Sequence, residues 1–335
     1  MARQTFTPAS RQHGLALITA MLVVAIAATT AAYLSFDQQI WLRQAQNLTD
    51  RAQAEVVRAG AQEWAITILA KDAKDSKNDD LTEDWAKPLP PLAVEGGQVT
   101  GRIFDAQGKF NLNNLVRGGA PSPADIGAFK HLLESFSIDP NLSDAVIDWI
   151  DADSNASSAG AEDIDYLQMK IPYRAANQPL QSVEELRLVR GFTKELVDKL
   201  RPWISALPQP TETNLNTAPK EVLSAVFYTL PISAIESFMA QRPYKNQVQM
   251  GQELVKLAAG TTLPQAFYGI KSSYFEVEVT TLFGRYQRTT QALIQRSAGE
   301  AGFRALWHSQ RLFAGFASSE SGLDENPDTA TGGNI

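Results

Sequence analysis

An uninterrupted run of apolar and small residues, LALITAMLVVAIAATTAAYL, extends from Leu15 to Leu34 and contains no charged side chain. A helix rises about 1.5 Å per residue, so a helix of this length matches a hydrocarbon layer roughly 30 Å thick. The pattern therefore predicts a helix that is long enough to span a membrane.

The pattern stays helical beyond this run but becomes amphipathic. Leu48, Ala52, Val56 and Ala59 recur at three- and four-residue steps, and charged residues occupy the other faces. A cleavable signal peptide is the main alternative, but its apolar region usually spans about 7–15 residues before a small-residue cleavage site. The continuous periodicity favours one long helix.

The charges on either side of the apolar run indicate its orientation. Arg3 and Arg11 precede the run, whereas the segment after it opens with Asp37. Because positively charged flanks favour the cytoplasmic side of a membrane, the short N-terminus is expected in the cytoplasm. The rest of the chain is then expected on the opposite side.

Strand patterns and a connector follow the helix. Residues 71–91 are polar and acidic and end in prolines, which is typical of an exposed connector, with Trp85 as a local anchor onto the core. Residues 98–104 alternate like a strand, and a turn at 105–108 leads into 110–115. We expect a hairpin that packs on the amphipathic part of the long helix.

Helical periodicity then continues for about 150 residues before strands return. The predicted helices lie at 122–135, 143–150, 182–188, 194–205, 219–228, 233–241 and 247–257. Tyr274–Phe283 and Tyr286–Arg296 alternate as strands and are joined across Gly284 and Arg285 as a tight hairpin.

These elements predict an α+β fold in which the long N-terminal helix packs on an antiparallel sheet and a large all-helical domain is inserted between the strands. The expected segments are a leader at 1–14, a transmembrane helix at 15–34, its amphipathic continuation at 35–70, a connector with the first strands at 71–117, the inserted helical domain at 118–270, the closing hairpin at 271–296 and a partly disordered tail at 297–335.

Composition limits the chemistry. The chain has 335 residues and no cysteine, so disulfides and thiolate catalysis are excluded. Its three histidines, at 13, 131 and 308, are too scattered for a conventional His-based zinc site. The formal net charge of −7 disfavours a nonspecific nucleic-acid binder, because such proteins neutralise phosphates.

The densest acidic stretch is DWIDADSNASSAGAEDIDY, which begins at Asp148. With Asp151 as position one, oxygen-bearing side chains fall at EF-hand positions three, five, seven and twelve, at Asp153, Asn155, Ser157 and Glu162. A hard dication would relieve the mutual repulsion of these carboxylates.

This loop departs from an EF-hand in two respects. Ala156 is at position six, where the sharp turn normally needs Gly, and Asp163 and Asp165 crowd the far end. We expect an EF-like site that is not an EF-hand. On spacing alone, an acidic loop that is only solvated surface stays an open alternative.

The N-terminal pattern resembles that of type IV pilins and pseudopilins. In that class a prepilin peptidase cuts after a Gly, here Gly14, and the new N-terminus, here Leu15, is methylated. Two positions depart from the common pattern: Leu15 replaces the usual Phe or Met, and Thr19 replaces the Glu that most members carry at mature position five. The missing Glu is typical of the K-type minor pseudopilins of type II secretion, the general secretion pathway protein K family.

The acidic stretch is similar to a motif of the same family, Asp-Trp-(Leu/Ile)-Asp-x-Asp followed by Gly-Ala-Glu-Asp and Tyr, whose acidic residues bind calcium. The resemblance implies a structural calcium ion, and Asn155 is added on spacing alone. The expected metal-ligating residues are Asp148, Asp151, Asp153, Asn155, Glu162, Asp163 and Asp165.

The resemblance also implies a place in the cell and a set of partners. The chain would be held in the bacterial inner membrane by a single pass, with its bulk in the periplasm. It would join the I and J types, and then the H type, at the tip of a filament of the major pseudopilin. As a cap it would initiate assembly and help to push folded substrates, which it would contact, through the outer membrane. Catalysis is not required.

The sequence also contains features of two other function classes, nucleic-acid binding and hydrolysis. Residues 184–200 are similar to a helix-hairpin-helix with Gly191 in its turn, so the alternative function is a membrane-anchored protein for DNA binding and uptake. The acidic composition favours an ordinary helical pair and no nucleic acid. Common hydrolase and nucleotide-binding motifs are absent from the sequence, and a glycosidase-like carboxylate pair stays open only because any Asp-rich chain offers one.

Overall fold

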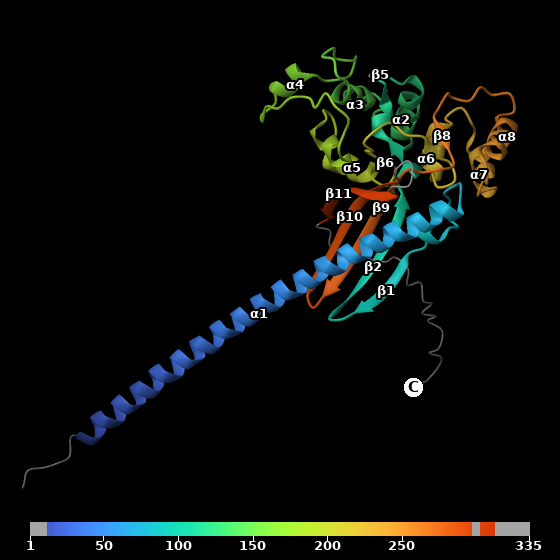
Figure 1. The fold of residues 1–335 in the computed structure, drawn as a ribbon. Helices are drawn as coiled ribbons and strands as arrows, with labels where there is room; N and C mark the ends of the chain where they lie inside the picture. The colour runs from blue at the N-terminus through green and yellow to red at the C-terminus, as the bar shows by residue number, and fades with distance from the viewer. Residues whose placement is uncertain (1–11, 297–301, 312–335) are drawn as a thin grey trace, which may run out of the picture.

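The computed structural model describes residues 12–296 and 302–311. Its most prominent element is α1, Gln12–Asp75, a continuous helix of 64 residues that extends far beyond the rest of the protein (Figure 1). Within the described residues, α1 is long and apolar enough to cross a membrane, and its apolar part is exposed. The predicted union of an apolar span and an amphipathic continuation in one helix is confirmed.

The C-terminal part of α1 packs on one five-stranded antiparallel sheet of order β1-β2-β9-β10-β11. The strands are β1 Leu89–Val94, β2 Gly97–Asp105, β9 Tyr274–Phe283, β10 Tyr286–Arg296 and β11 Phe303–Arg311. The predicted α+β architecture and the closing hairpin of β9 and β10 are confirmed. β2 and β9 are neighbours in the sheet although the whole helical domain separates them in the chain.

The predicted hairpin between 98–104 and 110–115 is wrong. The carboxylate of Asp105 accepts a hydrogen bond of 2.8 Å from the backbone N–H of Gln107, which starts the 3₁₀ turn η2, Ala106–Gly108, and turns the chain out of the sheet. β3, Phe110–Asn111, then pairs in parallel with β6, Ile204–Ser205, inside the helical domain. Leu112–Leu115 forms the 3₁₀ turn η3 and no strand.

Both outer strands of the sheet were missed by the sequence patterns. β1 lies within the proline cluster that was assigned to the connector, and Pro90 and Pro91 are tolerated there because an edge strand has N–H positions that need no sheet partner. β11 lies within the segment assigned to the tail, for which no strand was predicted. The end of the predicted tail, 312–335, lies outside the described residues.

The face of α1 that contacts the sheet is made by small and apolar residues. Ala54, Ala65 and Leu69 are buried, and the predicted anchor Trp85, in the short 3₁₀ turn η1 at Asp84–Ala86, packs edge-on against Phe275 with ring centroids 5.3 Å apart. Ala65, Leu69, Trp85 and Phe275 join Val99, Val277 and Ile294 in one core.

The apolar stripe recognised in the sequence is on the opposite face of α1. Leu48 and Val56 are 68% and 74% exposed, and Trp41 is 67% exposed. The sheet packs on the amphipathic part of α1, as expected, but through a different face. Val56 and Trp41 face away from the sheet, and Leu48 lies at the rim of a cleft between α1 and the sheet.

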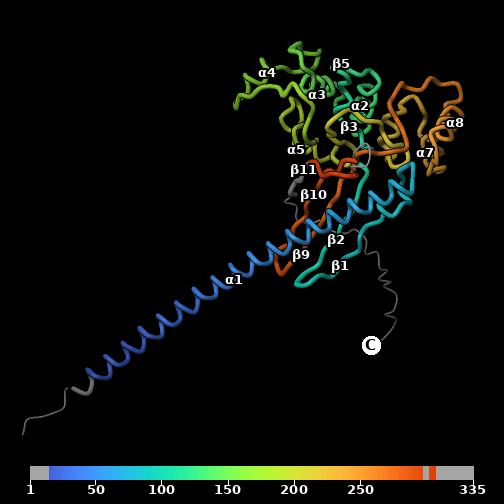
Figure 2. The backbone as a smooth tube through the Cα atoms, in the orientation of Figure 1, coloured from blue at the N-terminus to red at the C-terminus, as the bar shows by residue number. Residues whose placement is uncertain are grey.

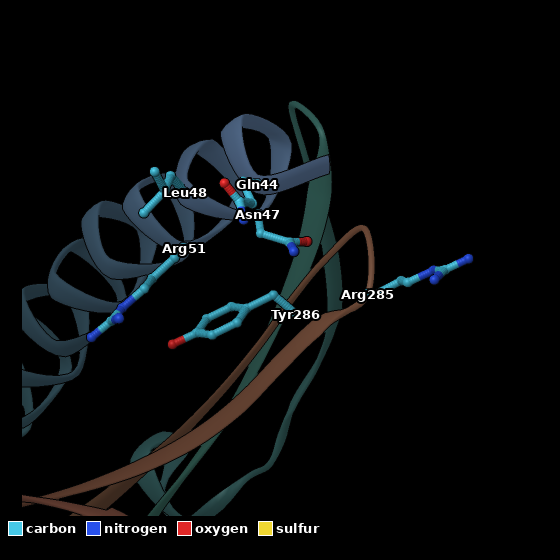
Figure 3. Close-up of a pocket in the computed structure, with 6 residues that line it drawn as sticks. All are labelled: Gln44, Asn47, Leu48, Arg51, Arg285 and Tyr286. Carbon is cyan, nitrogen blue, oxygen red and sulfur yellow. The ribbon is translucent and has the colours of Figure 1, made fainter. Parts of the chain in front are cut away.

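α1 and the sheet diverge at the end of the sheet that is closer to the apolar N-terminal part of α1. A cleft opens there between α1 and the turn that joins β9 to β10, and the ring of Tyr286 points across it toward the helix (Figure 3). The other lining residues are Gln44, Asn47, Leu48, Arg51 and Arg285.

The helical domain lies at the end of the sheet that is remote from the N-terminus of α1 (Figure 2). Its helices are α2 Pro123–Ser135, α3 Leu142–Ile150, α4 Asp163–Leu167, η4 Val183–Leu188, α5 Lys194–Leu200, α6 Lys220–Val226, α7 Ile232–Ala240 and α8 Gln247–Ala258. The short pairs of β4 with β5, Val116–Arg117 and Ala120–Pro121, and of β7 with β8, Thr213–Asn214 and Tyr268–Gly269, complete it. Every predicted helix is present, but 182–188 is 3₁₀ and the helix expected at 194–205 ends at Leu200.

A buried polar network joins the helical domain to the sheet. Asp105 Oδ2 accepts hydrogen bonds from the hydroxyls of Ser272 and Thr217, each at 2.6 Å, and from Asn214 Nδ2 at 2.8 Å. Burial raises the pKa of Asp105 to about 6. The chain therefore leaves and re-enters the sheet through a fixed junction.

Candidate metal centre

The acidic loop is placed by the two helices on either side of it. α3 ends at Ile150, and α4 begins at Asp163, so the loop from Asp151 to Glu162 connects two helices as an EF-hand loop does. α3 ends and α4 begins at the positions that the twelve-residue spacing requires.

Three carboxylates of this loop converge. Asp151, Asp153 and Glu162 each bring one oxygen within 4.8 Å of the others. Asp151 and Glu162 are buried, whereas Asp153 is exposed, so the group lies where the loop meets solvent. Three carboxylate oxygens that converge at one end of a loop are a donor set that suits a hard cation such as calcium.

Several of these oxygens have no hydrogen-bond partner. Oδ1 of Asp151 and both Oε atoms of Glu162 are buried and unpartnered among the described residues, and Glu162 is only 3% exposed. A buried carboxylate without a partner is costly, because it has lost its hydration and gained nothing in return. The unpartnered atoms fit a bound cation.

The raised pKa values of two carboxyls in the loop also point to a bound cation. Burial, and then the charges of Asp148 and Asp151, raise the pKa of Glu162 to about 7. Burial, and then the charges of Asp153 and Asp148, raise the pKa of Asp151 to about 6. A divalent cation would reverse this preference for the neutral form by supplying the missing positive charge.

Asp148 occupies a different position from these three. Its buried carboxylate accepts hydrogen bonds from the backbone N–H of Ser157 at 2.9 Å and from the Ser157 hydroxyl at 2.6 Å. Asp148 thus holds the middle of the loop against α3.

The last two predicted acidic ligands are held by arginines. Asp163 pairs with Arg174 at 3.0 Å, and Asp165 pairs with Arg190 at 3.2 Å. The signal for these pairs was absent from the sequence patterns because both arginines lie outside the acidic stretch.

Asn155 is exposed, and its backbone N–H donates to Asp153 Oδ1 at 2.8 Å. The structure thus brings three of the seven predicted ligands together. Coordination by any of the seven stays a prediction.

The loop is not an EF-hand in its backbone. An EF-hand turns sharply at position six, yet Ala156 is not among the described residues that have a positive φ. This agrees with the expectation that the site is EF-like only.

Three aromatic side chains pack together beside the acidic loop. Trp149 is buried and packs edge-on against Tyr166, with ring centroids 5.2 Å apart, and Tyr166 stacks on Tyr173. The Tyr166 hydroxyl accepts a hydrogen bond of 3.2 Å from the backbone N–H of Arg190. The rings join α3, α4 and the segment that follows into one core.

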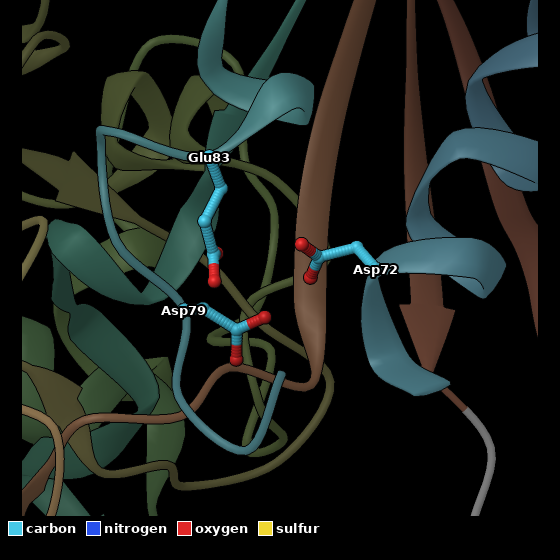
Figure 4. Close-up of side chains that lie close together, drawn as sticks. All are labelled: Asp72, Asp79 and Glu83. Atoms are coloured by element: carbon cyan, nitrogen blue, oxygen red, sulfur yellow. The ribbon is translucent and has the colours of Figure 1, made fainter. Parts of the chain in front are cut away.

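A second acidic group lies at the junction of α1 and the connector, where Asp72 faces Asp79 and Glu83 (Figure 4). In this group the positive charge comes from the guanidinium of Arg296, which donates to both oxygens of Asp79 at 2.6 and 3.0 Å. We therefore place the candidate metal centre at the first group.

Several basic groups in and beside the hairpin that resembled a DNA-binding module are engaged within the protein. Lys194 pairs with Asp198, Arg201 pairs with Asp198 and Glu184, and Arg190 pairs with Asp165. Gly191 has a φ of +86°, and an added Cβ would lie 2.4 Å from Leu142 Cδ2. The hairpin contributes to packing and to support of the acidic loop, which favours the ordinary helical pair.

Comparison with known proteins decides the family. The chain is 33% identical over 299 residues to type II secretion system protein K of Pseudomonas aeruginosa, which covers 85% of this chain and 89% of that protein. The chain belongs to the type II secretion system protein K family. Protein K is a minor pseudopilin component of that system.

Further matches agree with this assignment. The sequence model of the family described as type II secretion system (T2SS), protein K, matches residues 108–209. Protein K of Pectobacterium carotovorum is 32% identical over 302 residues, covering 82% of this chain and 90% of its own length. A chain in the crystal structure of the GspK-GspI-GspJ complex from enterotoxigenic Escherichia coli matches with a TM-score of 0.69 at 25% identity, over 80% of this chain and 99% of that chain.

The predicted processing site of this protein K chain lies at the start of α1. α1 continues through Gly14 and Leu15, and Thr19 lies one turn later. The Thr19 hydroxyl donates to the carbonyls of Leu15 and Ala16 at 3.1 and 3.0 Å. Thr19 therefore satisfies its own polar group inside the helix. Cleavage before Leu15 stays a prediction.

Proposed function

We propose that this chain caps the tip of the periplasmic pseudopilus, where it initiates assembly and helps to push folded substrates out. The observation that carries the proposal is the position of the helical domain. It extends beyond the end of the sheet, on the side remote from the apolar span of α1 (Figure 1). A subunit stacked above the chain in a filament would meet this domain, whereas subunits below it would not.

Thr19, at mature position five, also supports a place at the tip of the filament. A carboxylate inside a membrane is costly unless it is paired, and the usual Glu of pilins is understood to pair with the N-terminal amine of a neighbour. Thr19 bonds within its own helix and needs no such neighbour. The chain is suited to a place with no subunit beyond it.

The proposed partners are the I-type and J-type minor pseudopilins, then the H type and the major pseudopilin. Support comes from the solved relative, whose title describes a GspK-GspI-GspJ complex. The exposed apolar stripe of α1, with Trp41, Leu48 and Val56, offers a surface that another apolar helix would cover.

We further propose that the acidic loop holds a structural calcium ion. Asp151, Asp153 and Glu162 would supply oxygens, and the ion would neutralise the charges that burial disfavours. Bound there, it would fix the end of α3 relative to the start of α4. It would stabilise the domain without taking part in a reaction.

Processing and location complete the proposal. A prepilin peptidase would cut after Gly14, Leu15 would be methylated, and α1 would anchor the chain in the inner membrane with its body in the periplasm. The relatives are named as secretion-system proteins rather than enzymes, which agrees with steric and assembly work.

Co-purification of the full chain with its I-type and J-type partners in detergent tests this function. We expect a complex that contains one copy of each protein, measured by native mass spectrometry. A chain that binds neither partner, or that assembles into a polymer by itself, would contradict the proposal.

A further inference from the structure

We propose that Asp148 is a positioning residue that closes the acidic loop through Ser157 and is not itself a calcium ligand. This inference rests on the proposed calcium site and assigns a different role to a residue that the sequence motif groups with the ligands.

Both oxygens of the Asp148 carboxylate already accept a hydrogen bond from Ser157. Oδ2 accepts from the backbone N–H of Ser157 and Oδ1 accepts from the Ser157 hydroxyl, at 2.9 and 2.6 Å. In contrast, both oxygens of Glu162 and one of Asp151 are buried without a partner. Asp148 is also outside the set of carboxylates whose oxygens come within 4.8 Å of one another.

The loop is shaped around this carboxylate. Gly160 lies so close to Asp148 that an added Cβ would be 1.7 Å from Oδ2. The backbone N–H of Gly160 donates to the carbonyl of Ser157 at 3.0 Å, which closes a turn over the carboxylate. This contact gives a physical reason for Gly at position 160.

Closing this turn sets the position of a ligand. Glu162 follows Gly160 by two residues, so the placement of Gly160 limits where the Glu162 carboxylate lies relative to Asp151 and Asp153. Groups that orient metal ligands without touching the ion typically change affinity by about 10–100-fold when they are removed. We expect an effect of that size for Asp148.

The role can be separated from coordination by two substitutions at one position. Asp148→Asn keeps one oxygen to accept from the Ser157 N–H and gains an amide that can donate to the Ser157 hydroxyl, whereas Asp148→Ala keeps neither bond. Calcium binding to the full chain in detergent micelles would be measured by calorimetry. We expect Asp148→Asn to weaken binding by less than about 5-fold and Asp148→Ala by about 10–100-fold.

Two further variants calibrate the measurement. Glu162→Gln removes the charge of a proposed ligand and should abolish measurable binding. Asp144→Asn removes a charge one turn earlier on α3, where Asp144 pairs with Lys130, and should leave binding unchanged. If Asp148→Asn loses as much affinity as Glu162→Gln, Asp148 is a ligand and the proposal is wrong. If Asp148→Ala binds as the unaltered chain does, Asp148 has no positioning role.

A second measurement does not depend on calcium. Amide hydrogen exchange at Ser157 and Gly160 in the metal-free chain should accelerate in Asp148→Ala and stay slow in Asp148→Asn and Glu162→Gln. Equal exchange in all variants would overturn the positioning role. If the unaltered chain binds no calcium at all, the proposed metal site fails, and the exchange result still decides what Asp148 does.

Discussion

Two acidic groups in this chain have similar residues but different counter-charges. At Asp72, Asp79 and Glu83 the guanidinium of Arg296 lies within the group. At Asp151, Asp153 and Glu162 the nearby arginines bind Asp163 and Asp165 instead, which leaves buried oxygens without partners. At the residue scale, the position of the arginines decides which group is suited to a metal ion.

Calcium should therefore stabilise the protein through Glu162. A ligand present at about 100 times its dissociation constant adds about 2.7 kcal/mol, equivalent to roughly 4 °C in melting temperature for a chain of this size. We expect this shift between calcium and chelator in the unaltered chain and its loss in Glu162→Gln, measured by differential scanning fluorimetry. Superimposable melts of the unaltered chain would contradict the site.

Asp72 gives a prediction about pH. Burial, and then the charges of Glu83 and Asp79, raise the pKa of Asp72 to about 7, against the opposing effect of Arg296. A carboxyl with a raised pKa in the folded state stabilises it while protonated, and this contribution is lost as pH rises through about 7. The unaltered chain should therefore be less stable at pH 8 than at pH 5.5.

Asp72→Asn removes this titration, and Oδ2 of Asp72 has no hydrogen bond to lose. We expect the variant to be more stable than the unaltered chain at pH 8 by about 1 kcal/mol, or about 1–2 °C, with a flatter dependence between pH 5.5 and 8. Both proteins would be melted in excess calcium, so that the carboxyls of the acidic loop stay bound and do not contribute to the pH dependence. A variant that is less stable at pH 8 would show that Asp72 is needed as a carboxylate.

The sequence predicted the acidic residues of the candidate site but not their division of roles. The spacing from Asp151 to Glu162 is local and follows from the chain itself. The partners Arg174 and Arg190 are brought to Asp163 and Asp165 by the tertiary fold, and no periodic pattern encodes that contact.

At the scale of elements, α1 has two faces with different tasks. Ala54, Ala65 and Leu69 contact the sheet, while Leu48 and Val56 face solvent on the other side. Small residues toward the sheet let the helix lie close to the strands. The larger apolar side chains that stay exposed form the surface that we propose for contact with another pseudopilin.

A charge placed in this stripe should weaken assembly without unfolding the chain. Val56→Glu puts a carboxylate into the proposed helix contact, and we expect at least a tenfold loss of affinity for the I-type and J-type partners. Gln46→Glu adds the same charge at an exposed position on another face and serves as the control. Equal affinities for both variants, measured by calorimetry in detergent, would show that the stripe is not the contact.

Elements with a strong local period were predicted well, and elements defined by their partners were not. β9 and β10 alternate over ten residues or more and were predicted to the residue. β1 contains two prolines, and β11 follows a Gly- and Ser-containing segment, so their pairing depends on the neighbouring strand. The segment at 110–115 looked like a strand, but the Asp105 turn directs it into the helical domain.

At the scale of the whole molecule, one chain combines a helix that is long and apolar enough to cross a membrane, a sheet, and a domain that covers the far end of the sheet. The topology allows this because β2 and β9 are adjacent, so the helical domain can be inserted without interrupting the sheet. The family and the architecture follow from the sequence. The position of the domain beyond the sheet end required the structure.

Maturation should leave the helix intact. We expect mass spectrometry of the membrane-extracted chain to find an N-terminus at Leu15 carrying one methyl group. Gly14→Ala changes only the residue before the proposed cut and should lower the processed fraction. A mature protein that begins after the apolar run, and is found free in the periplasm, would exclude α1 as the anchor.

The most direct test of the capping role is the location of this chain in assembled filaments. Filaments formed with the major and minor pseudopilins would be labelled with gold-conjugated antibody against the helical domain and viewed by electron microscopy. The account predicts label at one end of each filament only. Label distributed along the filaments would contradict it.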